Sequence, residues 1–99
     1  MYVILWEYAV RPEKLPSFLD TYGPEGAWAR LFRQADGFLG VELLRSDDEG
    51  TRFVTLDRWR SRADFQAFRT GFSHVYEALD AALDDLTLSE TRIGGFEAG

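Results

Sequence analysis

The sequence predicts an α+β protein of the ferredoxin-like class, in which strands and helices follow the order βαββαβ and the helices lie on one face of a four-stranded antiparallel sheet. Three observations predict this class. Residues 2–10 are β-branched or aromatic almost throughout, as in a strand. Two regions with apolar residues at helical spacing alternate with strand-like segments. With 99 residues, 45% of them hydrophobic, the chain fits one core, so we expect a single domain over residues 1–99.

The first strand is expected over residues 2–10 and ends at Arg11 and Pro12. Side chains alternate between the two faces of a strand. Both sets are largely apolar here, with Tyr2, Ile4, Trp6, Tyr8 and Val10 on one face and Val3, Leu5 and Ala9 on the other. A strand that is apolar on both faces requires cover on both.

The first helical region is expected in two pieces. Residues 13–22 carry apolar side chains at helical spacing, and a glycine and a proline then interrupt the pattern. Pro24 and Glu25 have the character of the first turn of a second helix. The apolar side of this second helix is formed by Trp28, Leu31, Phe32 and Ala35. Gly37 is expected to end it.

The second half of the chain repeats the alternation. Further strands are expected at residues 38–45, 51–59 and 86–96. Ser61 and Asp64 form a capping box that predicts a helix start. Gly71 is expected to interrupt this helix, after which an apolar stripe with a period of 3.6 residues continues it.

Charge and composition exclude several functions. The net charge of −6 makes nucleic acid and anionic membranes poor partners. No apolar segment approaches the roughly 20 residues that span a bilayer. The absence of cysteine excludes disulfides, so we expect a cytoplasmic protein, and a single histidine argues against a zinc site. We expect no metal and no cofactor.

The predicted sheet has one face without cover. Two helices can shield one side of four strands, while about half of the apolar side chains of the first two strands point to the other side. In a chain of this length nothing remains to cover that face. A second copy is the simplest cover, since closed two-fold dimers are the commonest assembly. We therefore expect a homodimer.

Several segments, in order along nearly the whole chain, resemble one family. They are the first strand ending in Arg11–Pro12–Glu13, Tyr22–Gly23–Pro24, Trp28 with Leu31–Phe32, residues 37–44 (GFLGVELL), and Asp57, Trp59 and Ser61 before Phe65 and Phe68. With these segments the chain resembles the antibiotic biosynthesis monooxygenase-like members of the dimeric α+β barrel superfamily. The resemblance implies a barrel built from the sheets of two subunits, with a pocket between sheet and helices in each.

The family resemblance implies several activities among relatives. Some oxidise polycyclic phenols with O₂ and no cofactor, some degrade haem, and many have no known activity. The positions of the haem-binding residues correspond to Ala78, Trp6 and Phe68 here, which argues against haem. A histidine that other relatives carry is also missing, since Phe68 and Arg69 occupy its place.

The candidate catalytic residues are Asp57, Arg58, His74 and Tyr8. Asp57 and Arg58 are neighbours on a central strand, so one of them must point toward the helices, where a charge is costly unless it is paired or faces a cavity. Arg58 would hold a substrate oxyanion, or Asp57 would accept a proton. The alternative is an ion pair with Glu42 or Glu7. For His74, a place in solvent or at a helix start is favoured over catalysis.

The candidate substrate-binding residues are aromatic: Trp6, Trp28, Phe32, Trp59, Phe68, Phe72 and Tyr76. Rings at helical spacing usually belong to the core. Trp6 and Tyr8, however, place two rings with polar atoms on one strand face, as in small-ligand pockets. The acidic residues Asp80, Asp84 and Asp85 are expected to form a solvated helix face.

Three functions remain open from the sequence. The first is a cofactor-independent monooxygenase acting on an aromatic substrate of polyketide-like or quinol type. The second is a non-catalytic protein that binds a small ligand or senses it. The third is a structural dimer with a fully packed core. Polar groups inside an apolar cavity would separate the first two from the third.

Overall fold

The computed structural model describes all residues, 1–99, and has the predicted order of elements. The strands are β1 (Tyr2–Val10), β2 (Phe38–Arg45), β3 (Arg52–Trp59) and β4 (Thr87–Glu97). The helices are α1 (Leu15–Tyr22), α2 (Ala27–Phe32), α3 (Arg62–Gly71) and α4 (Ser73–Leu83). Short 3₁₀ turns at Pro12–Lys14 and Asp84–Leu86 precede α1 and β4. The ferredoxin-like fold is thereby confirmed.

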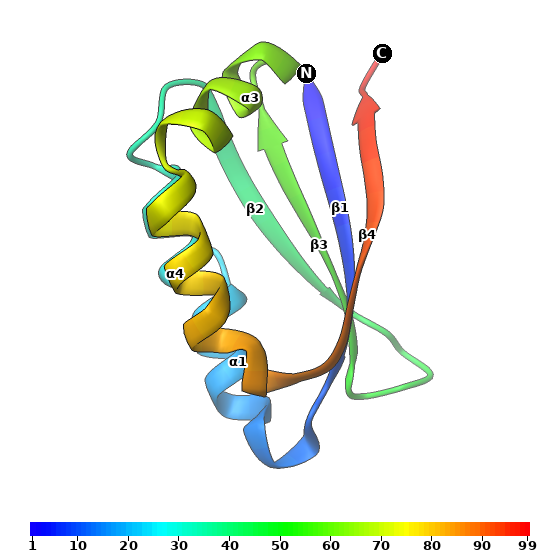
Figure 1. The fold of residues 1–99 in the computed structure, drawn as a ribbon. Coiled ribbons are helices and arrows are strands. Elements are labelled where there is room, and N and C mark those ends of the chain that lie inside the picture. Colours follow the sequence, from blue (N-terminus) through cyan, green and yellow to red (C-terminus); the bar gives the residue numbers. More distant parts are fainter.

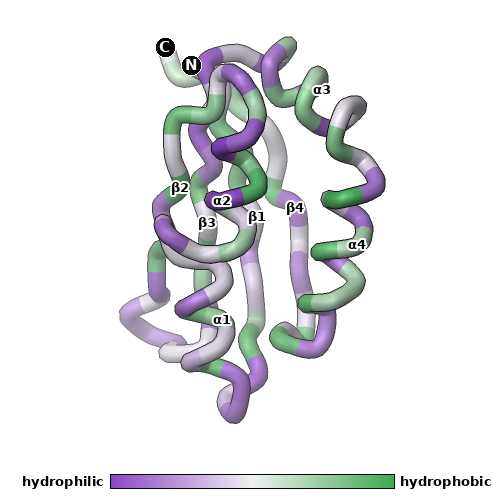
Figure 2. The backbone as a smooth tube through the Cα atoms, turned by 90° about the vertical axis from the view of Figure 1, so that its left-hand side faces the viewer, coloured by the Kyte–Doolittle hydropathy of each residue, from purple (hydrophilic) through white to green (hydrophobic).

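All four strands pair in antiparallel fashion in the order β2-β3-β1-β4. The helices form a single layer on one face of this sheet, and the other face carries no element of the chain (Figure 1). Figure 2 looks onto the helical layer and shows α1 and α2 in front of the sheet, with α3 and α4 running alongside them. The two termini lie at the same end of the sheet, where Ala98 N–H donates to Met1 O at 2.8 Å.

The register of β1 and β3 sorts side chains between the two faces. Trp6 pairs with Thr55 and Ile4 pairs with Asp57, and all four point toward the helices. The core between sheet and helices is largely aromatic, and its most deeply buried side chains include Trp59, Phe18, Phe53 and Phe68. None of the helices is long and apolar enough to span a bilayer.

The second helix begins later than the sequence predicts. Pro24 and Glu25 lie in a turn closed by a hydrogen bond of 3.0 Å from Gly26 N–H to Gly23 O, and α2 starts at Ala27. The turn needs glycine, because a Cβ atom on Gly26 would lie 2.1 Å from the carbonyl oxygen of Thr21.

The same helix also ends earlier than expected, at Phe32 instead of Ala35. Gln34 and Ala35 donate their N–H groups three residues back, to Leu31 and Phe32, at 3.1 and 3.0 Å. This spacing is that of a 3₁₀ turn and not of an α-helix. Gly37 follows with a φ of +88°, which a side-chain-bearing residue rarely adopts.

The start of α3 follows the predicted capping box. The hydroxyl oxygen of Ser61 accepts a hydrogen bond of 3.1 Å from the N–H of Asp64. The helix ends at Gly71, and α4 begins two residues later, so the predicted interruption is confirmed.

We expect Ser61→Ala to lower the free energy of unfolding by about 1 kcal/mol, because one N–H of the first turn loses its acceptor. Urea unfolding measures this loss, which Ser61→Thr should largely avoid.

Candidate functional site

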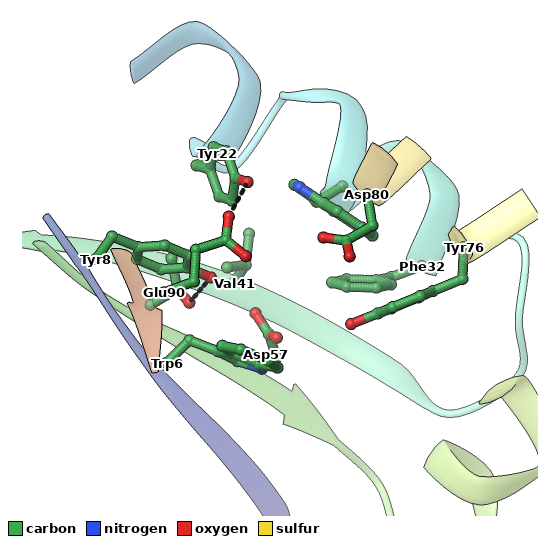
Figure 3. A pocket seen from close by; sticks show the side chains of 11 residues that line it. Trp6, Tyr8, Tyr22, Phe32, Val41, Asp57, Tyr76, Asp80 and Glu90 are labelled. Carbon is green, nitrogen blue, oxygen red and sulfur yellow. Dashed lines mark hydrogen bonds between the residues drawn. The ribbon is translucent and has the colours of Figure 1, made fainter. Parts of the chain in front are cut away.

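A pocket lies between the helix-facing side of the sheet and helices α1, α2 and α4 (Figure 3). The pocket opens to solvent, and its empty space, with part of the open solvent at its mouth, is about 420 Å³. Six aromatic side chains form most of its walls: Trp6, Tyr8, Tyr22, Trp28, Phe32 and Tyr76. The remaining lining residues are Val41, Thr55, Asp57, Asp80 and Glu90. An apolar cavity with a few convergent polar groups is the usual form of a small-ligand site.

Strand alternation explains how the sheet contributes to the pocket. Trp6 and Tyr8 are two residues apart on β1, and Thr55 and Asp57 are two residues apart on β3, so each pair shares the helix-facing side. Glu90 of β4 lies beside Tyr8 in the register of β1 and β4. Three adjacent strands therefore present polar atoms to one space.

Hydrogen bonds fix some of these polar groups. The hydroxyl groups of Tyr8 and Thr55 share a hydrogen bond of 3.1 Å, and Tyr22 donates its O–H to Glu90 Oε1 at 3.2 Å (Figure 3). Thr87 donates to the same Glu90 oxygen at 3.3 Å. Burial raises the pKa of Tyr8 and of Tyr22, so both hydroxyl groups are neutral donors at physiological pH.

Asp57 is the most unusual group of the pocket. Its side chain belongs to a residue that is only 8% exposed, and burial raises the pKa of its carboxyl group from 3.8 to about 7. No hydrogen bond or ion pair offsets the loss of water around it, since burial is the one cause of the shift. Figure 3 shows the carboxyl group turned into the pocket. A carboxyl group with a pKa near neutrality is suited to accept and return a proton.

The structure separates two of the other candidate catalytic residues, Arg58 and His74, from this pocket. Arg58 points to the opposite face of the sheet, where Nη2 lies 2.8 Å from Glu42 Oε1. Two roles were predicted for Arg58, an ion pair and the binding of a substrate oxyanion. The geometry supports the ion pair and not the oxyanion role. His74 is exposed on the first turn of α4 and does not line the pocket. Tyr8 does line it.

The expected aromatic residues fall into two groups. Trp6, Trp28, Phe32 and Tyr76 line the pocket, whereas Trp59, Phe68 and Phe72 do not. Trp59 and Phe68 are 0% and 1% exposed and pack against Phe32 with ring centroids 5.8 and 5.3 Å apart. Phe72 stacks on Phe68 at 5.3 Å. These three rings are core residues that support the wall formed by Phe32.

Five lining residues were not among the predicted site residues: Tyr22, Val41, Thr55, Asp80 and Glu90. Thr55 lies two residues before Asp57 on the same strand, a spacing that places it on the same face. Asp80 follows Tyr76 by one helical turn; it is exposed, as expected for a solvated helix face, and also borders the pocket. Glu90 had no local signal, because its position depends on pairing with a strand more than 80 residues earlier.

Acidic groups gather at the pocket without forming a metal site. No group of three or more His, Cys, Asp or Glu side chains is arranged to hold a metal ion. Burial and the charge of Asp80 raise the pKa of Glu90. The pocket is therefore acidic and aromatic.

Comparisons with known proteins identify the family and the fold of the chain. The antibiotic biosynthesis monooxygenase family model matches residues 1–79. A protein of Deinococcus radiodurans, assigned as an antibiotic biosynthesis monooxygenase, superposes with a TM-score of 0.76 at 19% identity, over 100% of this chain and 93% of that one. SnoaB from Streptomyces nogalater, a cofactor-independent oxygenase, superposes with a TM-score of 0.70 at 21% identity, over 99% and 92%.

A protein of Bordetella bronchiseptica, also assigned as an antibiotic biosynthesis monooxygenase, superposes with a TM-score of 0.76 at 20% identity, over 99% of this chain and 96% of that one. The comparison with curated proteins gives no significant match. Identities near 20% establish the shared fold alone, while the family model covers most of the chain. The chain belongs to the antibiotic biosynthesis monooxygenase family.

Proposed function

We propose that the chain is a cofactor-independent monooxygenase that oxidises an aromatic small molecule of polyketide-like or quinol type in this pocket. Asp57 carries the proposal, because it places an unpaired carboxyl group with a pKa of about 7 inside walls of aromatic rings. A base whose pKa lies near the working pH is best matched to removing a phenolic proton. SnoaB, which shares the fold, is a cofactor-independent oxygenase.

The proposed chemistry uses the substrate itself as the electron donor. Asp57 removes a proton from the substrate, and the resulting electron-rich anion gives electrons to O₂. One oxygen atom enters the substrate, and the other leaves as water with the two hydrogen atoms that the substrate loses. Tyr8, hydrogen-bonded to Thr55, supplies a neutral O–H group that can donate to the developing oxyanion. The aromatic walls exclude water from the reactive anion.

Oxygen uptake with anthrone and with a quinol tests the proposal. The wild-type protein is expected to consume O₂ faster than buffer, and Asp57→Asn to lower that rate about a hundredfold, since a positioned base contributes factors of this order. Asp47→Asn makes the same change of charge at an exposed turn outside the pocket and should keep the rate. Equal rates for the Asp57→Asn variant and the wild type would remove Asp57 from the mechanism.

A second candidate function is the non-catalytic binding of a small ligand. It is favoured by the absence of any Lys, Arg or His among the lining residues, because an oxidation through an anion benefits from a cation beside it. A ligand that raises the melting temperature and is recovered chemically unchanged in air would support this candidate over the oxygenase.

We further propose that two copies pair through the outer face of the sheet, the face without helices. A groove there is lined by apolar side chains of three strands, which include Leu5, Leu44, Val54 and Leu56. Leu44 is 46% exposed, and Phe96 of β4, on the same face, is 49% exposed. Glu7 pairs with Arg52, and Glu42 with Arg58, so the charges on this face are already balanced within one chain. An apolar surface with no unpaired charge is one that two copies can bury against each other across a two-fold axis.

A further inference from the structure

The charged side chains that line the pocket are all acidic. Asp57 from β3, Asp80 from α4 and Glu90 from β4 all line it, and no Lys, Arg or His does. Figure 3 shows the three carboxyl groups turned toward a common space from three different elements. The Arg69 guanidinium lies 3.8 Å from the Tyr76 ring centroid, yet it is not part of the lining. A ligand in this pocket therefore meets carboxyl groups as its only charged neighbours, beside the neutral hydroxyl and indole groups of the lining.

The most deeply buried of these carboxyl groups accepts no hydrogen bond from the protein. Glu90 accepts from Tyr22 and Thr87, whereas Asp57, more than nine-tenths buried, has no partner in the protein. A buried polar group without a partner costs free energy, and a charged one costs more. A partner that arrives with a ligand would recover part of that cost.

The aromatic walls favour the same kind of ligand. The rings of Trp28 and Tyr76 lie with centroids 5.0 Å apart at one side of the pocket, and those of Trp6 and Tyr8 lie 6.5 Å apart on the sheet. The faces of aromatic rings attract cations, and organic ammonium groups are commonly bound by several rings together with carboxylates. A phenolate or carboxylate ligand would meet repulsion from both the rings and the acids.

We infer that the pocket selects an aromatic small molecule that carries a protonated amine, with the ammonium group held by Asp57, Glu90 and Asp80 and the ring held among Trp6, Trp28 and Tyr76. The inference rests on the proposed function in that it names the class of substrate. No cation lines the pocket to stabilise the anion formed during the oxidation, and the inference assigns that role to the ammonium group of the substrate. The ammonium group would offset the negative charge that develops on the ring oxygen.

Calorimetric titration with three phenols that differ in one group tests the inference. Tyramine carries an amine, tyrosol a hydroxyl group and 4-hydroxyphenylacetate a carboxylate on otherwise similar frames. At about pH 8 we expect tyramine to bind at least ~10-fold more tightly than tyrosol, and the carboxylate to bind most weakly. Asp57→Asn and Glu90→Gln should each remove most of the preference for tyramine over tyrosol, and Asp47→Asn should leave that preference unchanged.

The pH dependence supplies a second readout. The titratable or charged groups near Asp57 are Tyr8, Tyr22, Tyr76, Asp80 and Glu90, with Arg69 against Tyr76. The tyrosines stay neutral because burial raises their pKa. A bound cation lowers the pKa of Asp57 from about 7, so binding near pH 6 must release a proton. Tyramine affinity should rise between about pH 6 and 8, by at most ~10-fold per unit, and Asp57→Asn should flatten most of this rise.

The outcomes separate this inference from the proposed oxygenase. Equal affinity for the three phenols, or a tyramine preference that survives the Asp57→Asn, Glu90→Gln double variant, overturns the inference even where anthrone or quinol is oxidised. A tyramine preference that both single variants abolish supports it even where no oxygen is consumed, in which case the oxygenase proposal fails alone. Far-ultraviolet circular dichroism and urea unfolding show that each variant is folded.

Discussion

Replacing Asp57 with asparagine is expected to stabilise the protein at pH 8 and to have little effect on stability near pH 4. Burial raises the pKa of Asp57 in the folded protein to about 7, against an ordinary value of 3.8. Between these two values the folded state holds a proton that the unfolded state has lost. Stability contributed by this group is therefore greatest at low pH and falls as the pH rises toward 7.

The size of the effect follows from the shift of the pKa. A difference of about 3 units at 1.36 kcal/mol per unit gives about 4 kcal/mol as the upper bound on the cost of ionising Asp57 in the folded state. Local relaxation and water entry reduce it, so we expect Asp57→Asn to exceed the wild type by about 2–4 kcal/mol at pH 8. An amide has nearly the same shape and no charge to bury.

Urea unfolding of both proteins at fixed protein concentration, in steps from about pH 4 to pH 8, measures this difference. The quantity to follow is the stability of the variant minus that of the wild type, because the other titrating groups then cancel. Among them, the Arg60 guanidinium lowers the pKa of Asp64, which contributes a pH dependence of opposite sign. The exposed control Asp47→Asn should show a flat difference. A flat difference for Asp57→Asn as well would contradict a raised pKa.

The place of Asp57 shows how far the sequence could predict this site. Because side chains alternate along a strand, the sequence alone predicts that Asp57 and Arg58 point to opposite faces of the sheet. Which face meets the helices could not be decided, because apolar residues stand on both sides of the strand, with Phe53 facing the helices and Leu56 facing away. Only the packing of the complete sheet resolves this choice.

The elements themselves were easier to predict than the members of the site. The bounds of β1 and β2 and the break between α3 and α4 follow from strand and helix periodicity and from Gly71. The start of α2 was mispredicted, because the close approach of Gly26 to the Thr21 carbonyl is a tertiary contact. The place of Glu90 depends on the register between β1 and β4, which shifts at two irregularities.

Replacing Leu5 with lysine is expected to dissociate the proposed dimer and to leave each chain folded. Leu5 is on the outer face of β1, in the groove that Leu44, Val54 and Leu56 also line. In the paired state its side chain would be enclosed by the second copy, where an unpaired ammonium group costs about 3–5 kcal/mol. In a single chain the same group reaches water. The substitution therefore acts on association and not on the core beneath the helices.

Sedimentation velocity over a range of concentrations around micromolar measures the effect. We expect a wild-type dimer and a Leu5→Lys monomer at the same concentration, since a loss of this size weakens association by more than about a hundredfold. Val75→Lys is the matched control, because Val75 is 53% exposed on α4, in the helical layer, and should leave the dimer intact. A wild-type protein that is monomeric throughout, or a Leu5→Lys variant that stays dimeric, would show that this face of the sheet is not where two copies meet.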